Sequence, residues 1–150
     1  MARFTRTQEV QAPPERVFQS LTDVEKFPEL FPDIFKKMEV VGAEGSSRII
    51  LCEEKWAGRS FRYKMKETLS PPDKIEHSIT EGNGKGSMET INLEKTPGGT
   101  RLTMVMDAKG LAAAVLGRLF RKQFEAEMSH IFDGYMKVVE AESRDSGLKV

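Results

Sequence analysis

The last third of the chain carries one long helical pattern, and this pattern most restricts the folds open to the sequence. From about residue 111 to about residue 141 there is no proline, and large apolar residues recur at spacings of three and four, on one face of a helix. These residues are Leu116, Phe120, Phe124, Met128, Ile131, Tyr135 and Val138. A helix of about thirty residues is roughly 45 Å long. It needs a partner surface of matching length, and a curved antiparallel sheet that leaves a space beside the helix is the obvious candidate.

The rest of the chain predicts seven strands and two short helices. Residues 3–11 alternate as a first strand. Prolines at 13 and 14 suit the first turn of a short helix with Val17, Phe18 and Leu21 on its apolar face. Thr22 and Glu25 resemble a capping box that starts a second short helix, which the prolines within residues 27–32 then end.

Six further strands are predicted, each followed by a short turn signal. They cover residues 36–41, 48–56, 59–69, 74–81, 87–95 and 100–108. Strands joined by short loops pair antiparallel, so these strands form a meander. Together with the helices they predict an α+β fold. The glycine-rich residues 82–87 lack the spacing of a phosphate loop and precede a strand, so we interpret them as a hairpin turn.

Alternation within the strands predicts which side chains face the helix. The inward sets are Phe61, Tyr63, Met65 and Leu69; Ile75, His77 and Ile79; and Leu102, Met104 and Met106. One apolar and one solvated face is what an antiparallel sheet covering a helix requires. The strand at 48–56 is less clear, because Ile49 and Leu51 oppose Ile50, Cys52 and Glu54.

Composition excludes several classes of protein. With 39% hydrophobic and 31% charged residues, the 150-residue chain predicts one folded domain over residues 1–150, with a frayed tail at about 143–150. Lysine plus arginine and aspartate plus glutamate number 23 each, which argues against a nucleic-acid partner. The absence of an apolar signal core and of a run of about eighteen apolar residues predicts a cytoplasmic protein with no transmembrane segment.

Cofactor and metal sites are also not expected. The single cysteine, Cys52, excludes an internal disulfide and a cysteine zinc site, and we interpret it as a small buried hydrophobe. There are two histidines and no clear carboxylate cluster beside them in the sequence, so we expect no metal site. No motif indicates a bound cofactor.

Several segments resemble a known superfamily. Residues 10–18, residues 21–32, the turn and strand at 99–103 and the long terminal helix are similar to those of the START-like, or SRPBCC, superfamily. Within it the chain most resembles the polyketide cyclase/dehydratase group and the related coenzyme Q-binding START proteins. The resemblance implies the helix-grip fold, a seven-stranded curved sheet around the terminal helix with a cavity for hydrophobic ligands. These motifs are structural and carry no chemistry, so they imply little about activity.

The inward strand residues and the helix stripe are the expected lining of such a cavity. The candidate ligand-binding residues are Trp56, Phe61, Tyr63, Met65, Ile75, His77, Ile79, Met88, Leu102, Met104, Met106, Phe120, Phe124, Met128 and Ile131. Several are methionines, whose flexible side chains adapt to irregular ligands. Ordinary core filling is the alternative interpretation.

Four polar residues are candidates for catalysis. His77, Tyr63, Glu54 and Glu127 could each supply an acid or a base, and burial would raise the pKa of either carboxyl. The alternatives are a structural histidine with one hydrogen bond, a tyrosine packed in the core, and carboxylates in water at the rim or paired with Arg62 or Lys64. His130 is offset from the apolar stripe and is expected at the surface.

The sequence therefore predicts that the chain binds or transfers a hydrophobic small molecule, namely a lipid, an isoprenoid or quinone, or a polyketide-like compound. One alternative is an enzyme of the cyclase or dehydratase type, and another is a module that binds a protein or the ribosome. The small apolar run at 110–117, followed by Arg118, Arg121 and Lys122, also allows transient contact with a membrane surface. Close packing of a helix end is the alternative for that run.

Overall fold

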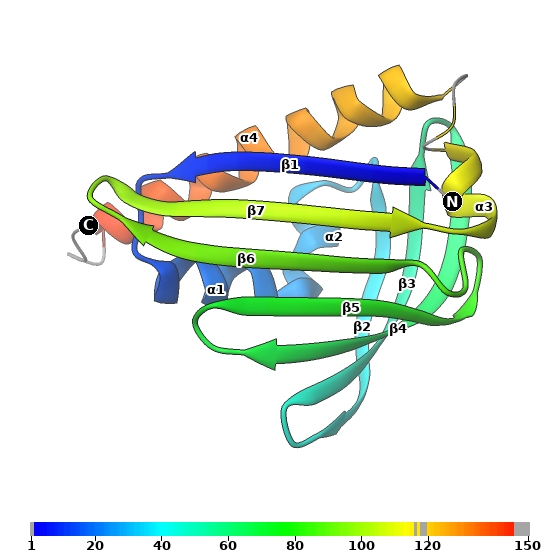
Figure 1. Ribbon diagram of the computed structural model, residues 1–150, viewed down its shortest axis with the longest axis horizontal. Helices are drawn as coiled ribbons and strands as arrows, with labels where there is room; N and C mark the ends of the chain where they lie inside the picture. Colours follow the sequence, from blue (N-terminus) through cyan, green and yellow to red (C-terminus); the bar gives the residue numbers. More distant parts are fainter. Residues whose placement is uncertain (1, 116, 118–119, 146–150) are drawn as a thin grey trace.

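The computed structural model describes residues 2–115, 117 and 120–145, and within them the chain forms a seven-stranded antiparallel sheet. The strand order is β1-β7-β6-β5-β4-β3-β2. The strands are β1 (Ala2–Val10), β2 (Phe35–Glu44), β3 (Ser47–Trp56), β4 (Arg59–Ser70), β5 (Lys74–Gly82), β6 (Met88–Thr96) and β7 (Gly99–Ala108). The meander from β2 to β7 is closed by β1, which pairs with β7. The sheet bends so that β2, β3 and β4 turn away from the other strands (Figure 1).

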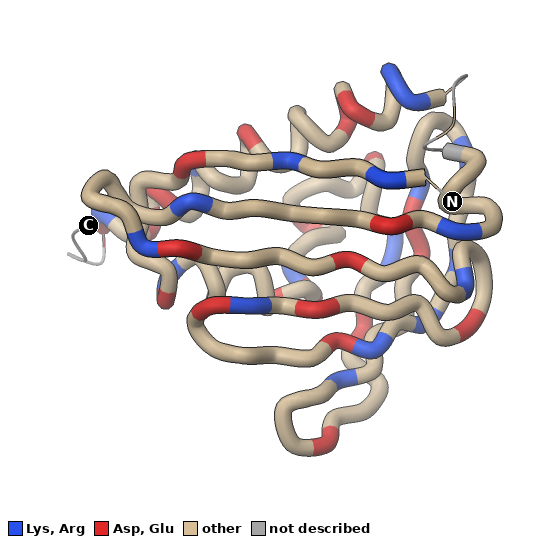
Figure 2. Tube along the Cα trace, viewed as in Figure 1, with Lys and Arg blue, Asp and Glu red and all other residues tan. Residues whose placement is uncertain are grey.

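Helices cover one face of this sheet (Figure 1). They are α1 (Pro14–Thr22), the 3-10 helix η1 (Val24–Lys26), α2 (Phe27–Leu30), α3 (Gly110–Val115) and α4 (Arg121–Asp145). A curved sheet that holds a long C-terminal helix confirms the predicted helix-grip fold. Charged residues of both signs are interspersed along the strands (Figure 2). Among them, Arg3 pairs with Asp107 at 2.8 Å between β1 and β7.

The segment between α1 and β2 differs from the prediction. The Thr22 hydroxyl does not cap a helix, because it donates to the carbonyl oxygens of Phe18 and Gln19 at 3.0 and 3.1 Å. The Glu25 carboxylate accepts a hydrogen bond from the Val40 amide at 3.2 Å, so it ties η1 to β2. The capping box was therefore wrong. The helical turn α2 lies within the segment expected to break the helix, because Pro28 falls in its first turn, where a missing N–H costs no helical hydrogen bond.

The terminal helix is also shorter at its start and longer at its end than expected. Within the described residues, α4 has 25 residues, and α3 is a separate helix. The amide of Gly117 donates to the carbonyl oxygen of Ala114, and the amide of Arg121, the first residue of α4, donates to the carbonyl oxygen of Gly117. Glycine is a poor helix former, which explains the interruption. The predicted stripe residue Leu116 lies outside the described residues, as does Arg118.

At the other end, α4 continues to Asp145 and buries Ser143, whereas a frayed tail was expected from about residue 143; fraying of this end stays a prediction. Residues 146–150 lie outside the described part of the chain. The buried face of α4 is wider than the predicted stripe, since Phe132, Met136 and Val139 are buried beside it while Val138 is half-buried.

The core consists of two clusters. The first core cluster joins α1, β1, one residue of β4, β5, β6, β7 and α4, and includes Val17, Leu102, Phe124, Met128 and Val139. The second core cluster joins η1, β2, β3, β4 and one residue of α4, and consists of Val24, Ile34, Phe35, Met38, Ile50, Cys52, Met65 and Ile131. Because the sheet bends between the two groups of strands, side chains of the two clusters do not fill all the space between them.

Candidate ligand-binding cavity

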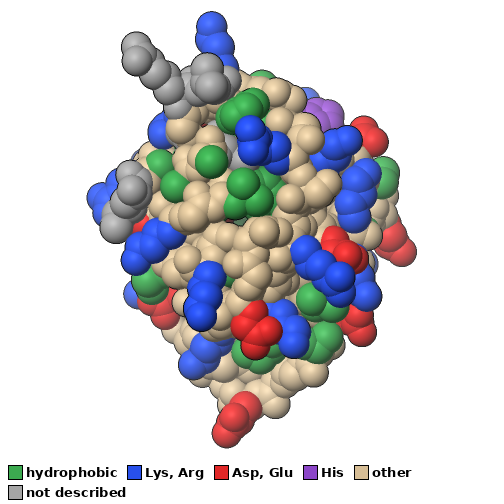
Figure 3. Space-filling model, turned by 90° about the vertical axis from the view of Figure 1, so that its right-hand side faces the viewer, with side chains coloured by type: hydrophobic (Ala, Val, Ile, Leu, Met, Phe, Trp, Pro, Cys, Tyr) green, Lys and Arg blue, Asp and Glu red, His purple; other side chains and the backbone are tan. Residues whose placement is uncertain are grey.

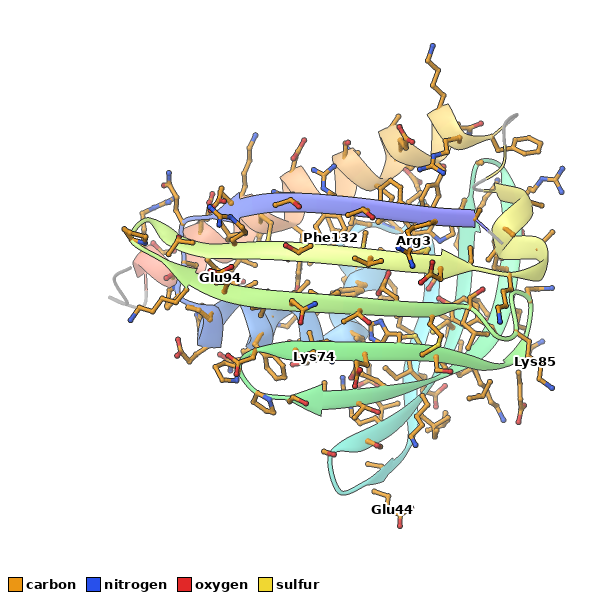
Figure 4. The ribbon with its side chains drawn as sticks, viewed as in Figure 1. Arg3, Glu44, Lys74, Lys85, Glu94 and Phe132 are labelled. Carbon is orange, nitrogen blue, oxygen red and sulfur yellow. The ribbon has the colours of Figure 1, made fainter. Side chains whose placement is uncertain are left out.

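An apolar cavity of about 190 Å³ lies between the two core clusters, where the sheet faces α4. Its lining consists of Leu21, Val24, Phe27, Phe31, Phe35, Met38, Glu54, Trp56, Phe61, Tyr63, Met65, His77, Ile79, Glu89, Ile91, Met104, Met106, Ala112, Phe124, Met128, Ile131, Phe132 and Tyr135. Phe132 lies on the α4 side of the sheet, whereas Lys85 projects from the β5–β6 turn and Glu44 from the end of β2, both at the edges of the molecule (Figure 4).

Most of the candidate ligand-binding residues lie at this cavity. Those in the lining are Trp56, Phe61, Tyr63, Met65, His77, Ile79, Met104, Met106, Phe124, Met128 and Ile131. They come from β3, β4, β5, β7 and α4, and alternation along each strand turns them toward the helix. Contact between these side chains and a ligand stays a prediction.

Two strand candidates from the sequence lie elsewhere in the core. Ile75 and Leu102 do not line the cavity, because they pack in the first core cluster with almost no exposed surface. Both face inward as predicted, but neighbouring side chains fill the space around them.

Met88 and Phe120 are also absent from the lining. Met88 is 57% exposed, because it lies opposite Asp107 on the outer face of the sheet, and its neighbour Glu89 is the inward residue. Phe120 lies under the guanidinium group of Arg59, 4.4 Å from the ring centre, and is only partly buried.

The helical segments after β1 supply lining residues that the sequence pattern did not indicate. They are Leu21, Val24, Phe27 and Phe31. The large aromatic residues on either side of Pro28 could have indicated these lining positions. The prediction that the helix ends in this segment gave no reason to place them at the cavity. Phe35, Met38, Glu89, Ile91 and Phe132 were also not predicted.

One wall of the cavity is polar, and it begins with Glu54 on β3. One carboxylate oxygen of Glu54 accepts from the Trp56 indole N–H at 2.8 Å, and the other accepts from the Tyr63 hydroxyl at 2.6 Å. Burial raises the pKa of Glu54, against the two hydrogen bonds, which lower it. Burial and the nearby Glu54 charge raise the pKa of Tyr63 well above its ordinary value. The prediction that Glu54 lies in water at the rim was therefore wrong.

His77 on β5 forms the second part of this wall and lies between two carboxylates. Its Nδ1 is 2.7 Å from Glu89 on β6, and its Nε2 is 2.8 Å from Glu67 on β4. Burial acts to lower the pKa of His77, but the hydrogen bonds and charges of Glu67 and Glu89 outweigh it and raise the pKa to about 9. At neutral pH the imidazole is therefore a cation that donates from both nitrogens.

The fully buried Glu67 extends this network to Arg48 on β3. The Arg48 Nε donates to the Glu67 carboxylate at 2.8 Å, and a second guanidinium nitrogen contacts the same oxygen. Burial favours the neutral form of Glu67, but His77 and Arg48 outweigh it and hold the pKa below its ordinary value. The sequence showed no clear carboxylate cluster beside the histidines, because Glu67 and Glu89 come from the neighbouring strands β4 and β6.

The remaining polar candidates are not at the cavity. The Glu127 carboxylate accepts from the Ala57 amide at 2.6 Å, so it holds the β3–β4 turn against α4. His130 is exposed, as expected. Cys52 is buried, and its Sγ lies 3.8 Å from the Ile50 carbonyl oxygen. Burial and the Glu54 charge raise the pKa of this thiol, so it is a weak nucleophile.

The run at 110–117 forms α3 at one end of the molecule. Leu111, Ala112 and Ala113 are half-buried and pack against the first core cluster. Viewed toward this end, apolar side chains are exposed among lysine and arginine side chains (Figure 3). Transient contact of this surface with a membrane stays a prediction. Within the described residues, no helix is long and apolar enough to cross a membrane.

Metal binding has no candidate cluster in the part of the chain that the structure describes, since no three or more histidine, cysteine, aspartate or glutamate side chains are grouped for it. The polar residues of the lining, Glu54, Tyr63, His77 and Glu89, are instead hydrogen-bonded acids, a tyrosine and one histidine. These groups can orient a ligand or exchange a proton with it.

Comparison with known proteins adds a family match. Residues 1–140 match the family described as polyketide cyclase/dehydrase and lipid transport. None of the curated proteins compared with the chain matches its sequence.

Solved structures share this fold over nearly their whole length. A protein from Thermus thermophilus has a TM-score of 0.76 at 21% identity, covering 95% of this chain and 98% of its own. A START superfamily protein from Mycobacterium smegmatis has a TM-score of 0.75 at 17% identity, covering 94% and 99%. The Zhui aromatase/cyclase of a Streptomyces species has a TM-score of 0.72 at 15% identity, covering 97% and 98%. At these identities the likeness shows the fold alone.

Proposed function

Because the chain belongs to the polyketide cyclase/dehydrase and lipid transport family, we propose that it binds a hydrophobic small molecule in the cavity between the sheet and α4. The predicted resemblance to the START-like superfamily agrees with this membership. The ligand classes we propose are those expected from the sequence, namely a lipid, an isoprenoid or quinone, or a polyketide-like compound.

The observation that carries this proposal is the apolar lining of the space between the sheet and α4. Burial of apolar ligand surface stabilises a complex by about 2.5 kcal/mol per 100 Å², before the cost of association. The cavity volume of about 190 Å³ is below the roughly 300–1,000 Å³ that is usual for ligand sites. The geometry therefore favours a slender molecule, or a single chain or ring of a larger one, over a bulky fused-ring compound.

Catalysis of the cyclase or dehydratase type is a second candidate. The observation that favours it is the buried pair of Glu54 and Tyr63, together with the charged His77, at the cavity surface. We place it second because each of these groups already has a partner within the protein, which suits holding a ligand better than transferring a proton.

Blocking the cavity tests the binding proposal. We expect N-phenyl-1-naphthylamine, a neutral fluorescent probe, to bind the wild-type protein saturably. The variant Met106→Trp places an indole in the cavity and should weaken binding by about tenfold or more. Binding is measured by fluorescence titration, with circular dichroism to show that each variant is folded.

The matched control is Met88→Trp, the same substitution on the outer face of the adjacent strand β6. It should bind the probe as the wild type does. Absence of saturable binding by the wild type would contradict the proposal, and so would equal affinity of the folded Met106→Trp variant.

A further inference from the structure

The hydrogen bonds of the polar wall show what kind of ligand head it accepts. We use this name for Glu54, Tyr63, His77 and Glu89, which all line the cavity. They lie on the four consecutive strands β3 to β6, and they form two hydrogen-bonded pairs, Tyr63 with Glu54 at 2.6 Å and His77 with Glu89 at 2.7 Å.

With Glu54 ionised, the form that its two accepted hydrogen bonds favour, every donor of the polar wall is already used. The single proton of the Tyr63 hydroxyl goes to Glu54, and the Trp56 N–H beside it goes to the same carboxylate. Both ring nitrogens of His77 face carboxylates. A tyrosine has one proton to give and a protonated imidazole two, so none remains for a ligand.

Hydrogen-bond acceptors of the polar wall, in contrast, remain available to a ligand. Each carboxylate oxygen can accept about two hydrogen bonds, and each oxygen of Glu54 receives one. Within the described residues, only one oxygen of Glu89 has a partner, which is His77. The Tyr63 oxygen donates its proton and keeps its lone pairs. A ligand hydroxyl could therefore donate to any of these three residues.

A ligand anion would find no free cation there. The two cations of the network, Arg48 and His77, each face a carboxylate already. No lysine or arginine is among the described lining residues. A ligand carboxylate would have to enter an apolar space beside Glu54 and Glu89, where repulsion and lost hydration both oppose it.

We propose, on the basis of the cavity function above, that the ligand is a neutral amphiphile whose head donates a hydrogen bond, an alcohol or a phenol, and is not a fatty acid or other carboxylate. The apolar body occupies the space between the core clusters. The hydroxyl head points to Glu54, Tyr63 and Glu89.

Competition among three matched compounds tests this assignment. We use 1-decanol, its methyl ether and decanoate to displace N-phenyl-1-naphthylamine from the wild-type protein at about pH 8, where the acid is ionised. Decanol should displace the probe about fivefold more effectively than the ether, which lacks the donor. It should exceed decanoate by about tenfold or more.

The variant Glu89→Gln provides the internal check. Loss of this negative charge should improve decanoate binding relative to decanol by about fivefold. The control Glu94→Gln changes an exposed carboxylate on the outer face of the same strand and should leave the ratio unchanged. Circular dichroism establishes that both variants are folded.

The outcomes separate the two proposals. Probe binding together with equal or better displacement by decanoate would overturn the head-group assignment and leave the cavity function intact. Equal displacement by decanol and its ether would also overturn the assignment. Failure of the wild type to bind the probe or any of the three compounds would remove both proposals.

Discussion

His77 illustrates how neighbouring strands change the character of a single side chain. On its own strand it lies between Ile75 and Ile79, and alternation predicts only that it faces inward. Its two carboxylate partners are Glu67, directly opposite on β4, and Glu89, directly opposite on β6. An imidazole between apolar neighbours would be neutral, whereas these partners make it a cation.

We predict that this network makes stability depend on pH in the alkaline range. The pKa of His77 is raised from 6.5 to about 9 in the folded protein. The stabilisation is therefore fully present below about pH 6.5 and is lost as the pH rises through about 9. The free energy of unfolding of the wild type, measured with urea, should fall by up to about 3 kcal/mol across this interval. The lowered pKa of Glu67 reflects the same interaction with His77, so it does not contribute a second, separate stabilisation.

The variant His77→Gln should lack this decline, since glutamine does not titrate. His130→Gln, which changes an exposed histidine on α4, is the control and should decline as the wild type does. An equal pH dependence of His77→Gln and wild type would show that the network does not supply this stability.

Among the secondary-structure elements, the turns follow the sequence signals more closely than the helix ends do. The predicted strands agree with the observed ones to within about two residues at most ends, as is usual for such boundaries. The capping box and the uninterrupted terminal helix were wrong, because Glu25 bonds to β2 and Gly117 lies in a bend between α3 and α4. A contact with a distant strand decided the first boundary, and a single weak helix former decided the second.

The turn between β6 and β7 offers a matched pair of glycines. Gly99 has a φ of +143°, and a Cβ there would lie 2.2 Å from the Val10 carbonyl oxygen, whereas nothing lies within 4 Å of a Cβ at Gly98. We expect Gly99→Ala to lower the free energy of unfolding by at least about 2 kcal/mol, because β1 or the turn must shift.

Gly98→Ala should change stability by less than about 1 kcal/mol, since space is available for the methyl group. Urea unfolding of the two variants and the wild type measures the difference. Equal stability of Gly99→Ala and Gly98→Ala would mean that β1 does not approach the turn as closely as described.

At the scale of the whole molecule, the cavity connects the stability of the fold to the proposed binding of a ligand. The two core clusters consist of buried side chains, and the cavity lies between them. A ligand that binds only the folded state stabilises it by about 2.7 kcal/mol at a hundredfold excess over Kd. Under the proposed function, a bound ligand would therefore also complete the core.

We predict opposite effects of Met106→Trp on these two properties. Without ligand, the free energy of unfolding should stay equal to that of the wild type or rise by about 0.5–2 kcal/mol, because the indole fills empty space. With N-phenyl-1-naphthylamine, the increase in melting temperature seen for the wild type should disappear. Thermal unfolding with and without the probe measures both. A loss of more than about 2 kcal/mol without ligand would mean that the cavity walls are already close-packed.

Much of the fold could be predicted from local patterns. Alternation in β4, β5 and β7 identified the inward face, and glycine and proline signals identified the turns, since both are properties of consecutive residues. Met88 marks the limit of this reasoning. Because a shift of one residue exchanges the two faces of a strand, the pairing of Met88 with Asp107 placed Glu89 inward.

The chemistry of the cavity depended on groups that are distant in the sequence. The hydrogen bond between Tyr63 and Glu54 and the contacts of His77 with Glu67 and Glu89 all cross between strands. Periodicity predicted which side chains of a strand face the helix but carried no information about which charges face one another. Sheet register and the curvature between the core clusters set those distances, and Coulomb energies and desolvation depend on distance and burial rather than on residue type.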